Sequence, residues 1–185
     1  MQLYPVFLKL SGKRVLIVGG GVVAAGKLDG LLAAGALVTV VAPEINEAIE
    51  RPGVTVHRRR FKPADLDGAW WVVAAATPEV NRQVQAAAEP RQVFVNAVDD
   101  PAHATAYLGG VVRRDDVTIA ISTGGRAPAL AGLLREALDS WLPQDIDIWM
   151  QAADRARSLW KEISVPLERR RPMLLETLNR LYEEK

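Results

Sequence analysis

Residues 15–24 read VLIVGGGVVA, a short apolar run followed by three glycines and then by small and β-branched residues. The apolar run is typical of a buried parallel strand that ends at Gly19. Residues 22–34 are rich in Ala, Leu and Val and precede Gly35, which predicts a helix with a glycine after its last turn. A second apolar strand is predicted over residues 38–41. This part of the chain therefore predicts a strand–turn–helix–strand unit.

The glycine loop, residues 19–24, has the form G-x-G-x-x-A between a strand and a helix. In this motif the first glycine, Gly19, makes a tight turn, and the second, Gly21, lets a pyrophosphate approach the backbone. The N–H groups that open the helix, with Val22 and Val23, then bind that pyrophosphate. The motif predicts a bound dinucleotide, and the alternative is a tight strand–helix turn without a ligand.

Two further positions belong to the predicted cofactor site. Glu44 follows Pro43 after the second strand, where an acid accepts a hydrogen bond from the adenosine ribose and repels a 2′-phosphate. No Arg or Lys follows immediately, which favours NAD over NADP. Thr77 comes directly after a strand predicted over residues 70–76, at the edge where open α/β sheets bind ligands. The alternative is that Glu44 and Thr77 cap the helices that follow them.

The pattern of strands and helices continues to about residue 100. Strands are predicted over residues 54–56, 70–76 and 93–95, and helices over residues 45–49 and 79–88. Strands that alternate with helices form parallel, doubly wound sheets with right-handed crossovers. The sequence therefore predicts an α/β fold of the Rossmann type for this part of the chain.

Beyond residue 100 the pattern changes. Residues 111–122 predict an antiparallel hairpin, because apolar residues alternate with polar or small ones from Val117 on. A helix is predicted over residues 127–142, and helical periodicity continues over residues 146–185, divided by Pro166. The chain thus predicts a hairpin–helix segment and then a small helical domain.

Two adjacent acids, Asp99 and Asp100, follow the strand predicted over residues 93–95. They lie at the edge of the sheet that also carries the glycine loop. An acid there can act as a base, or can stabilise positive charge that develops on a hydride donor. Asp-Asp-Pro is also an ordinary turn sequence, so both interpretations stay open. His103, in the polar loop that follows, is interpreted as a solvated side chain.

The hydroxyl–glycine loop consists of Ser122, Thr123, Gly124, Gly125 and Arg126. It leads into a predicted helix, and exposed N–H groups at such a helix start bind anions. Arg126 adds a guanidinium that pairs with carboxylates. The loop is therefore predicted to bind a carboxylate-rich substrate, and the alternative is a capped helix start with glycines for the turn.

The composition argues against several classes of protein. The chain has 185 residues, is 49% hydrophobic and has a net charge of +1, which does not favour nucleic-acid binding. It has no cysteine and two histidines, which argues against disulfides, thiolate catalysis and a resident metal site. No apolar run reaches the about 18–20 residues that span a bilayer. A cytoplasmic protein that binds neither nucleic acid nor membrane is predicted.

Five segments together closely resemble one known family, precorrin-2 dehydrogenase, the NAD-dependent part of sirohaem synthase. They are residues 4–8 (YPVFL), 15–21 (VLIVGGG), 40–44 (VVAPE), 96–101 (NAVDDP) and 118–125 (TIAISTGG). The resemblance implies oxidation of precorrin-2 to sirohydrochlorin with NAD⁺, and some members also insert Fe²⁺ to give sirohaem. It implies that Asp99 is the catalytic acid/base, and we predict that Asn96 and the hydroxyl–glycine loop bind the substrate. Thr123 falls where relatives carry a Ser or Thr of the substrate pocket.

The resemblance also implies a domain organisation. The predicted domains are an NAD-binding Rossmann domain over residues 1–105, a dimerisation segment over 106–143 and a helical domain over 144–185, in a homodimer. Residues 107–110 (YLGG) depart from the Phe–x–x–Pro-like pattern of relatives, which alters the predicted wall of the substrate pocket. The alternatives are another small NAD-dependent dehydrogenase and a regulatory domain that senses NAD.

Overall fold

The structure of the protein is a computed structural model that describes residues 3–183. The chain forms two compact units, and the boundary lies between Leu108 and Gly109. Each unit has its own hydrophobic core.

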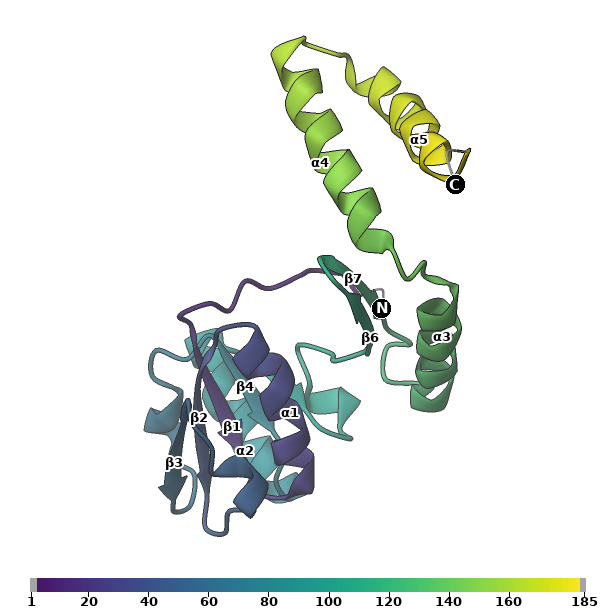
Figure 1. The fold of residues 1–185 in the computed structure, drawn as a ribbon. Helices are drawn as coiled ribbons and strands as arrows, with labels where there is room; N and C mark the ends of the chain where they lie inside the picture. Colours follow the sequence, from purple (N-terminus) through teal and green to yellow (C-terminus); the bar gives the residue numbers. More distant parts are fainter. Residues whose placement is uncertain (1–2, 184–185) are drawn as a thin grey trace. The chain divides into compact units, whose positions relative to one another are not determined.

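A five-stranded sheet forms the centre of the first unit (Figure 1). Its strands are β1 (Arg14–Val18), β2 (Leu37–Ala42), β3 (Val54–Arg58), β4 (Trp71–Ala74) and β5 (Phe94–Ala97). They lie in the order β3-β2-β1-β4-β5, and every neighbouring pair is parallel. This order reverses direction beside β1, and open α/β sheets bind ligands at the carboxyl ends of the strands at such a point. The predicted Rossmann-type sheet is confirmed.

Two helices cover the two faces of this sheet: α1 (Val22–Ala33) and α2 (Pro78–Ala88) (Figure 1). Alternate side chains of each strand point to opposite faces. One set, with Val15 and Ile17, packs under α1, and the other, with Leu16 and Val18, packs under α2. Burial of each such side chain contributes about 1.5–3 kcal/mol. Both layers hold the carboxyl end of β1 in place.

The predicted helix over residues 45–49 is wrong in extent. The structure has a single 3₁₀ turn there, η1 (Glu47–Ile49). The Asn46 N–H donates to the Gly20 carbonyl (N···O 2.7 Å), and the Asn46 side chain accepts from the Ala48 N–H. Asn46 is therefore held against the glycine loop, and the chain after it makes only a short turn. Three further 3₁₀ turns are η2 (Pro63–Leu66), η3 (Glu89–Arg91) and η4 (Pro101–His103).

The strand predicted over residues 70–76 is shorter in the structure, because β4 ends at Ala74. The Ala75 N–H still donates to the Val18 carbonyl (2.8 Å), but the Ala76 N–H donates to the Asn81 side chain (3.0 Å). Residues 75–77 therefore leave the sheet and form a loop before α2. That loop lies at the same edge of the sheet as Gly19.

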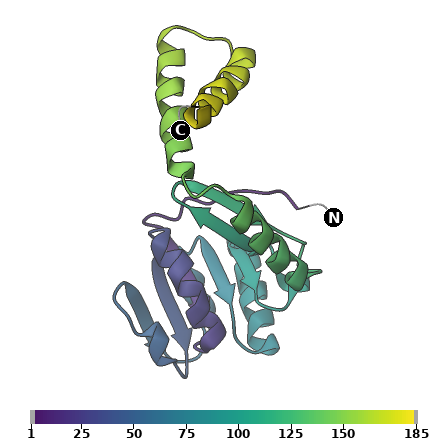
Figure 2. The ribbon, with the colours of Figure 1, turned by 45° about the vertical axis from the view of Figure 1, so that its right-hand side comes forward.

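The second unit begins with an antiparallel hairpin of β6 (Gly110–Arg114) and β7 (Val117–Ile121). Three helices follow: α3 (Pro128–Trp141), α4 (Ile146–Glu162) and α5 (Leu167–Glu183). Figure 2 shows α3 against the hairpin and α4 beside α5. The apolar residues of β7 are half-buried and the alternate ones exposed, as their period of two predicts. The hairpin and the helices agree with the sequence prediction.

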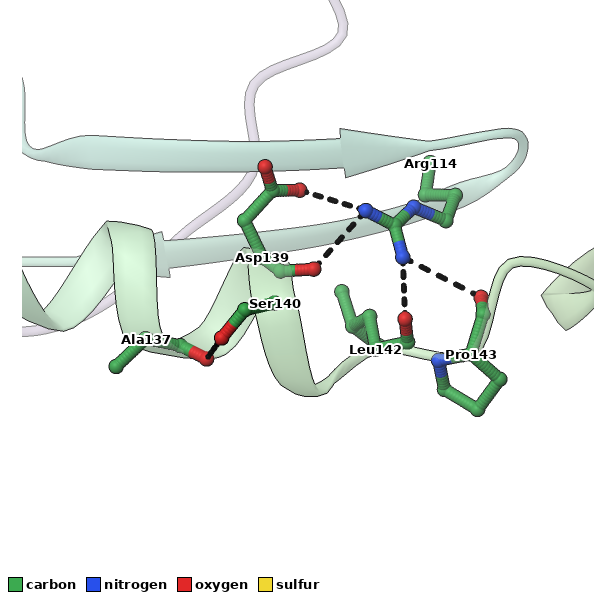
Figure 3. Close-up of polar contacts among 6 residues, drawn as sticks. All are labelled: Arg114, Ala137, Asp139, Ser140, Leu142 and Pro143. Atoms are coloured by element: carbon green, nitrogen blue, oxygen red, sulfur yellow. Dashed lines mark hydrogen bonds and ion pairs between the residues drawn. The ribbon is translucent and has the colours of Figure 1, made fainter.

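Arg114, at the end of β6, holds the carboxyl end of α3 (Figure 3). One guanidinium nitrogen donates to both the carbonyl and the side chain of Asp139, each at 2.9 Å. The other donates to the carbonyls of Leu142 and Pro143. These carbonyls have no partner within the helix, so the guanidinium satisfies them and complements the helix dipole. Arg114 thereby fixes α3 to the hairpin.

Within residues 3–183, none of the helices is long and apolar enough to cross a membrane. The same residues contain no group of three His, Asp or Glu side chains placed to hold a metal ion.

Candidate functional site

The first two glycines of the glycine loop are packed against protein backbone. Gly19 has φ +127°, and a Cβ added there would lie 2.2 Å from the Ala75 carbonyl oxygen. A Cβ added at Gly20 would lie 1.9 Å from the Glu44 carbonyl oxygen. Any side chain at either position would displace a neighbouring loop. The three loops that follow β1, β2 and β4 are therefore in close contact at this edge of the sheet.

Gly21 differs from the other two glycines, because a Cβ added there would meet nothing within 4 Å. Its backbone is extended (φ −86°, ψ −173°), and it is the residue before the first turn of α1. The Val22 and Val23 side chains are exposed, and Ala24 is fully buried against the sheet. The first N–H groups of a helix have no acceptor within it. An open backbone surface beside such N–H groups fits a dinucleotide pyrophosphate.

The structure settles one alternative for Glu44. The 3₁₀ turn after β2 is capped by Asn46, whose side chain accepts from the Ala48 N–H (2.9 Å). Glu44 is not the cap, and both Pro43 and Glu44 are exposed beyond the end of β2. The carbonyl of Glu44 forms the surface on which Gly20 packs. The Glu44 carboxylate is therefore available to a ligand that lies over the glycine loop.

Thr77 occupies the position before α2, but its side chain makes no capping hydrogen bond. The Asn81 side chain, from within α2, bonds to the loop before the helix: its oxygen accepts from the Ala76 N–H, and Asn81 is almost completely buried. The Asn81 amide thus fixes the β4–α2 loop next to Ala75, the residue whose carbonyl packs against Gly19. Thr77 is left exposed at the end of that loop.

The acidic turn, residues 98–101, follows β5 at the same edge of the sheet. The Val98 N–H donates to the Ala74 carbonyl (3.0 Å), which ties the turn to the end of β4. β5 lies two strands from β1, and neighbouring strands are about 4.8 Å apart, so the turn begins about 10 Å from the glycine loop. Asp99 is exposed and has φ +56°, a left-handed conformation that Asp tolerates better than most residues.

The second acid of the turn has a defined partner, His103, whose side chain is still 37% exposed. The Asp100 Oδ2 lies 2.8 Å from the His103 Nδ1. This hydrogen bond lowers the pKa of the Asp100 carboxyl below its usual value. Because an ionised carboxylate only accepts hydrogen bonds, Nδ1 of His103 carries the proton. The Asp100 carboxylate is therefore hydrogen-bonded to His103, whereas the Asp99 side chain is exposed to solvent.

Asn96, predicted to bind the substrate, lies within β5 and is almost completely buried. Its side-chain amide donates to the Ala106 carbonyl (3.0 Å). The N–H groups of Thr105 and Ala106 both donate to the Val95 carbonyl. In the structure Asn96 thus holds residues 105–106 along the edge of β5.

The hydroxyl–glycine loop belongs to the second unit, between β7 and α3. Gly124 and Gly125 have φ values of +64° and +75°, so the loop turns at two consecutive left-handed residues. The Ser122 hydroxyl accepts from the Gly124 N–H (3.1 Å), and the Thr123 hydroxyl accepts from the Ala127 N–H (3.2 Å). Arg126 is exposed. The two hydroxyls thus shape the loop before α3 without capping the helix, and the exposed charge of the loop is the Arg126 guanidinium.

The contacts of three residues in these features were not predicted from the sequence: Gly20, Asn81 and His103. Gly20 is the second of the three glycines and occupies the first x position of G-x-G-x-x-A, to which the motif assigns no role, so its packing against Glu44 was not predicted. Asn81 had a detectable signal, because it shares a helix face with Val84 and Ala88, both fully buried. A polar residue in an apolar stripe needs a hydrogen-bond partner.

Comparison with known families gives two matches. A family described as putative NAD(P)-binding matches residues 6–110. A family described as the sirohaem biosynthesis protein central region matches residues 114–140. The first match covers the sheet, the glycine loop and the acidic turn, and the second covers most of the hairpin and α3.

Individual relatives give the same result. The chain is 42% identical over 176 residues to siroheme synthase 1 of Aeromonas hydrophila, and 36% identical over 184 residues to siroheme synthase of Photorhabdus laumondii. These matches cover 92% and 97% of this chain, but the chain spans only 38% and 39% of those relatives. Among solved structures, SirC, a precorrin-2 dehydrogenase, matches with a TM-score of 0.73 and 28% identity, over 94% of this chain and 88% of that one. The predicted resemblance is confirmed.

Proposed function

Because the chain belongs to the putative NAD(P)-binding family over residues 6–110, we propose that it is an NAD-dependent dehydrogenase that oxidises precorrin-2 to sirohydrochlorin in sirohaem biosynthesis. One observation carries the proposal. A glycine loop and an acidic turn share one edge of the sheet in a chain that is similar over 94% of its length to a precorrin-2 dehydrogenase. The cytoplasmic location predicted from the sequence belongs to the same proposal.

The residues of the glycine loop fit the cofactor. Gly21 leaves its backbone open, and the N–H groups of Val22 and Val23 begin α1, so they would hold the pyrophosphate. Glu44, after Pro43, would accept from the adenosine ribose, and Thr77 would border the nicotinamide side of the crevice. When bound, NAD⁺ supplies the acceptor for the hydride that leaves the substrate.

Asp99 has the position and the chemistry to handle the proton. Oxidation of precorrin-2 to sirohydrochlorin removes a hydride and a proton. The Asp99 carboxylate is exposed at the carboxyl edge of the sheet and can accept that proton, or stabilise the positive charge that develops as the hydride leaves. Asp100 is paired with His103 and is therefore the less available of the two acids.

Substrate recognition is assigned to two elements. Precorrin-2 carries many carboxylates, and the hydroxyl–glycine loop presents Arg126 beside a helix start. A guanidinium there binds carboxylates through charge-assisted hydrogen bonds. Asn96 stays in the predicted substrate site, although its side chain also holds Ala106.

NAD⁺ is expected to bind about 10-fold or more tightly than NADP⁺, because the Glu44 carboxylate repels a 2′-phosphate. Two arginines at the end of β3 do not offset the negative charge of Glu44, because each is already paired with an acid. Arg58 pairs with Glu50, and Arg59 pairs with Asp65. Titration of the protein with each cofactor measures the ratio. Glu44→Gln should bring the affinities for NAD⁺ and NADP⁺ closer together. Equal binding of both cofactors by the unmodified protein would contradict the prediction.

The chain is expected to be a homodimer that associates through the hairpin and α3. On α3, Leu130, Leu133, Leu134 and Trp141 share one face and are exposed, Trp141 to 75%. A two-stranded hairpin is marginal alone, so this surface needs cover. Light scattering at micromolar concentration should give twice the chain mass, and Leu133→Glu should give the monomer mass. A monomeric unmodified protein would refute the expectation.

The proposed activity is tested by adding NAD⁺ and precorrin-2 to the protein and following the absorbance of sirohydrochlorin. The product should appear together with NADH. A protein that binds NAD⁺ but leaves precorrin-2 unchanged would instead be a different dehydrogenase or an NAD-sensing domain. Adding Fe²⁺ to the sirohydrochlorin formed tests the second activity, insertion of iron, which the resemblance implies for some members of the family.

A further inference from the structure

The acidic turn has a backbone that needs outside support. Asp99 is a non-glycine residue in the left-handed region, with φ +56°. Within the turn, the Asp100 N–H reaches the Ala97 carbonyl only at 3.4 Å, which is long for a hydrogen bond. A left-handed residue keeps one conformation only where its surroundings hold it. The direction of the Asp99 carboxylate therefore depends on contacts made by its neighbours.

Two side chains from the following segment supply such contacts. His103 Nδ1 donates to Asp100 Oδ2 at 2.8 Å, immediately after Asp99. The Tyr107 hydroxyl donates to the Pro101 carbonyl, also at 2.8 Å. The turn is thus held at each of the two residues that follow Asp99, and neither bond involves the Asp99 side chain.

The backbone next to Tyr107 is hydrogen-bonded to the edge strand β5. The residue before it, Ala106, donates its N–H to the Val95 carbonyl and accepts from the Asn96 amide at 3.0 Å. Asn96 is itself buried in β5. The contacts form a closed path from β5 through Asn96 and Ala106 to Tyr107, and from its hydroxyl back to the turn at Pro101.

We infer that Tyr107 and His103 are positioning residues, which orient the Asp99 carboxylate through Pro101 and Asp100. The inference rests on the proposed function, in which Asp99 handles the proton. The turn carries the reacting group on a loop, and displacement of such a group by about 1 Å costs about 100-fold in rate. These two hydrogen bonds reduce that displacement.

The test compares turnover and the protection of backbone amides from hydrogen exchange in five single variants of the full chain. Tyr107→Phe removes only the hydroxyl, and His103→Ala removes the bond to Asp100. His103→Asn places an amide N–H near the position of Nδ1 and keeps that bond. Tyr4→Phe and His57→Ala are the matched controls, because both side chains are exposed outside the turn.

Tyr107→Phe and His103→Ala should each lower kcat by about 10-fold, with unchanged KM for NAD⁺ and unchanged Tm. His103→Asn and both controls should stay close to the unmodified protein. In an Asp99→Asn background, Tyr107→Phe should lower the residual rate by less than about twofold, because both residues act through the same carboxylate.

Hydrogen exchange read by mass spectrometry gives a result that does not depend on the substrate. Peptides covering residues 97–103 should exchange faster in Tyr107→Phe and His103→Ala, and not in His103→Asn or the controls. Unchanged exchange in both variants would overturn the inference, whatever the protein oxidises. An unchanged kcat in both variants would also overturn the inference, as would a loss of kcat that comes with a lower Tm. The same holds if Tyr107→Phe lowers the rate by its full factor in the Asp99→Asn background. Faster exchange in a protein that does not oxidise precorrin-2 would overturn the proposed function alone.

Discussion

Asp99→Asn is expected to lower the rate of precorrin-2 oxidation by about 100-fold or more, with NAD⁺ binding and Tm close to those of the unmodified protein. Asparagine keeps the shape of the side chain but has neither its charge nor its titratable proton. It also tolerates the left-handed backbone of Asp99, so the turn should still form. Turnover with saturating NAD⁺, a cofactor titration and a thermal melt measure the three quantities.

The chain offers a closely matched control for this variant. Asp115 is also an exposed aspartate in the left-handed region, with φ +48°, but it lies in the turn between β6 and β7. Asp115→Asn makes the same chemical change in the same backbone conformation and should leave turnover unaltered. Near-normal turnover of Asp99→Asn would show that Asp99 is only a turn residue. If Asp99→Asn does not fold, its loss of activity would not support a catalytic role for Asp99.

Gly21→Ala is expected to weaken NAD⁺ binding by about 10-fold or more without destabilising the protein. The added methyl group meets nothing within 4 Å in the protein, and its backbone is extended, which alanine adopts freely. It would occupy the space beside the first N–H groups of α1, where the pyrophosphate is proposed to bind. Calorimetric titration with NAD⁺ and a thermal melt measure the two effects.

Gly26→Ala is the control, because Gly26 lies inside α1 and a Cβ there also meets nothing within 4 Å. This change should stabilise the helix by about 1 kcal/mol and leave NAD⁺ affinity as it is. Gly19 and Gly20 are unsuitable for the test, since a side chain at either would collide with backbone of a neighbouring loop. Unchanged NAD⁺ affinity in Gly21→Ala would place the cofactor elsewhere.

The elements that carry the proposed nucleotide site were predictable because their signals are local. The apolar run before Gly19, the Ala- and Leu-rich segment after it and the return to β-branched residues each have a distinct period. The predicted helix over residues 22–34 differs by one residue from α1 (Val22–Ala33). The predictions that were wrong in extent, residues 45–49 and 70–76, lie where the chain meets the glycine loop.

In the acidic turn, too, the local structure was predictable from the sequence but the tertiary contact was not. The adjacent acids and the proline predicted a turn after a strand, and the structure has one. The partner of Asp100 was not predictable, because a histidine three residues along in a polar loop is equally compatible with a solvated side chain. Its position depends on η4, which turns His103 back toward Asp100.

The amino-acid sequence alone was sufficient to predict the parallel α/β unit, the place of the glycine loop and the hairpin–helix segment after it. These features follow from residue periodicity and backbone preference, which act over a few neighbouring residues. The strand order, the burial of Asn81 and Asn96 and the contacts of His103 and Tyr107 came from the tertiary structure. They depend on which segments pack together and on the space left for each side chain, and close packing of the whole unit sets both.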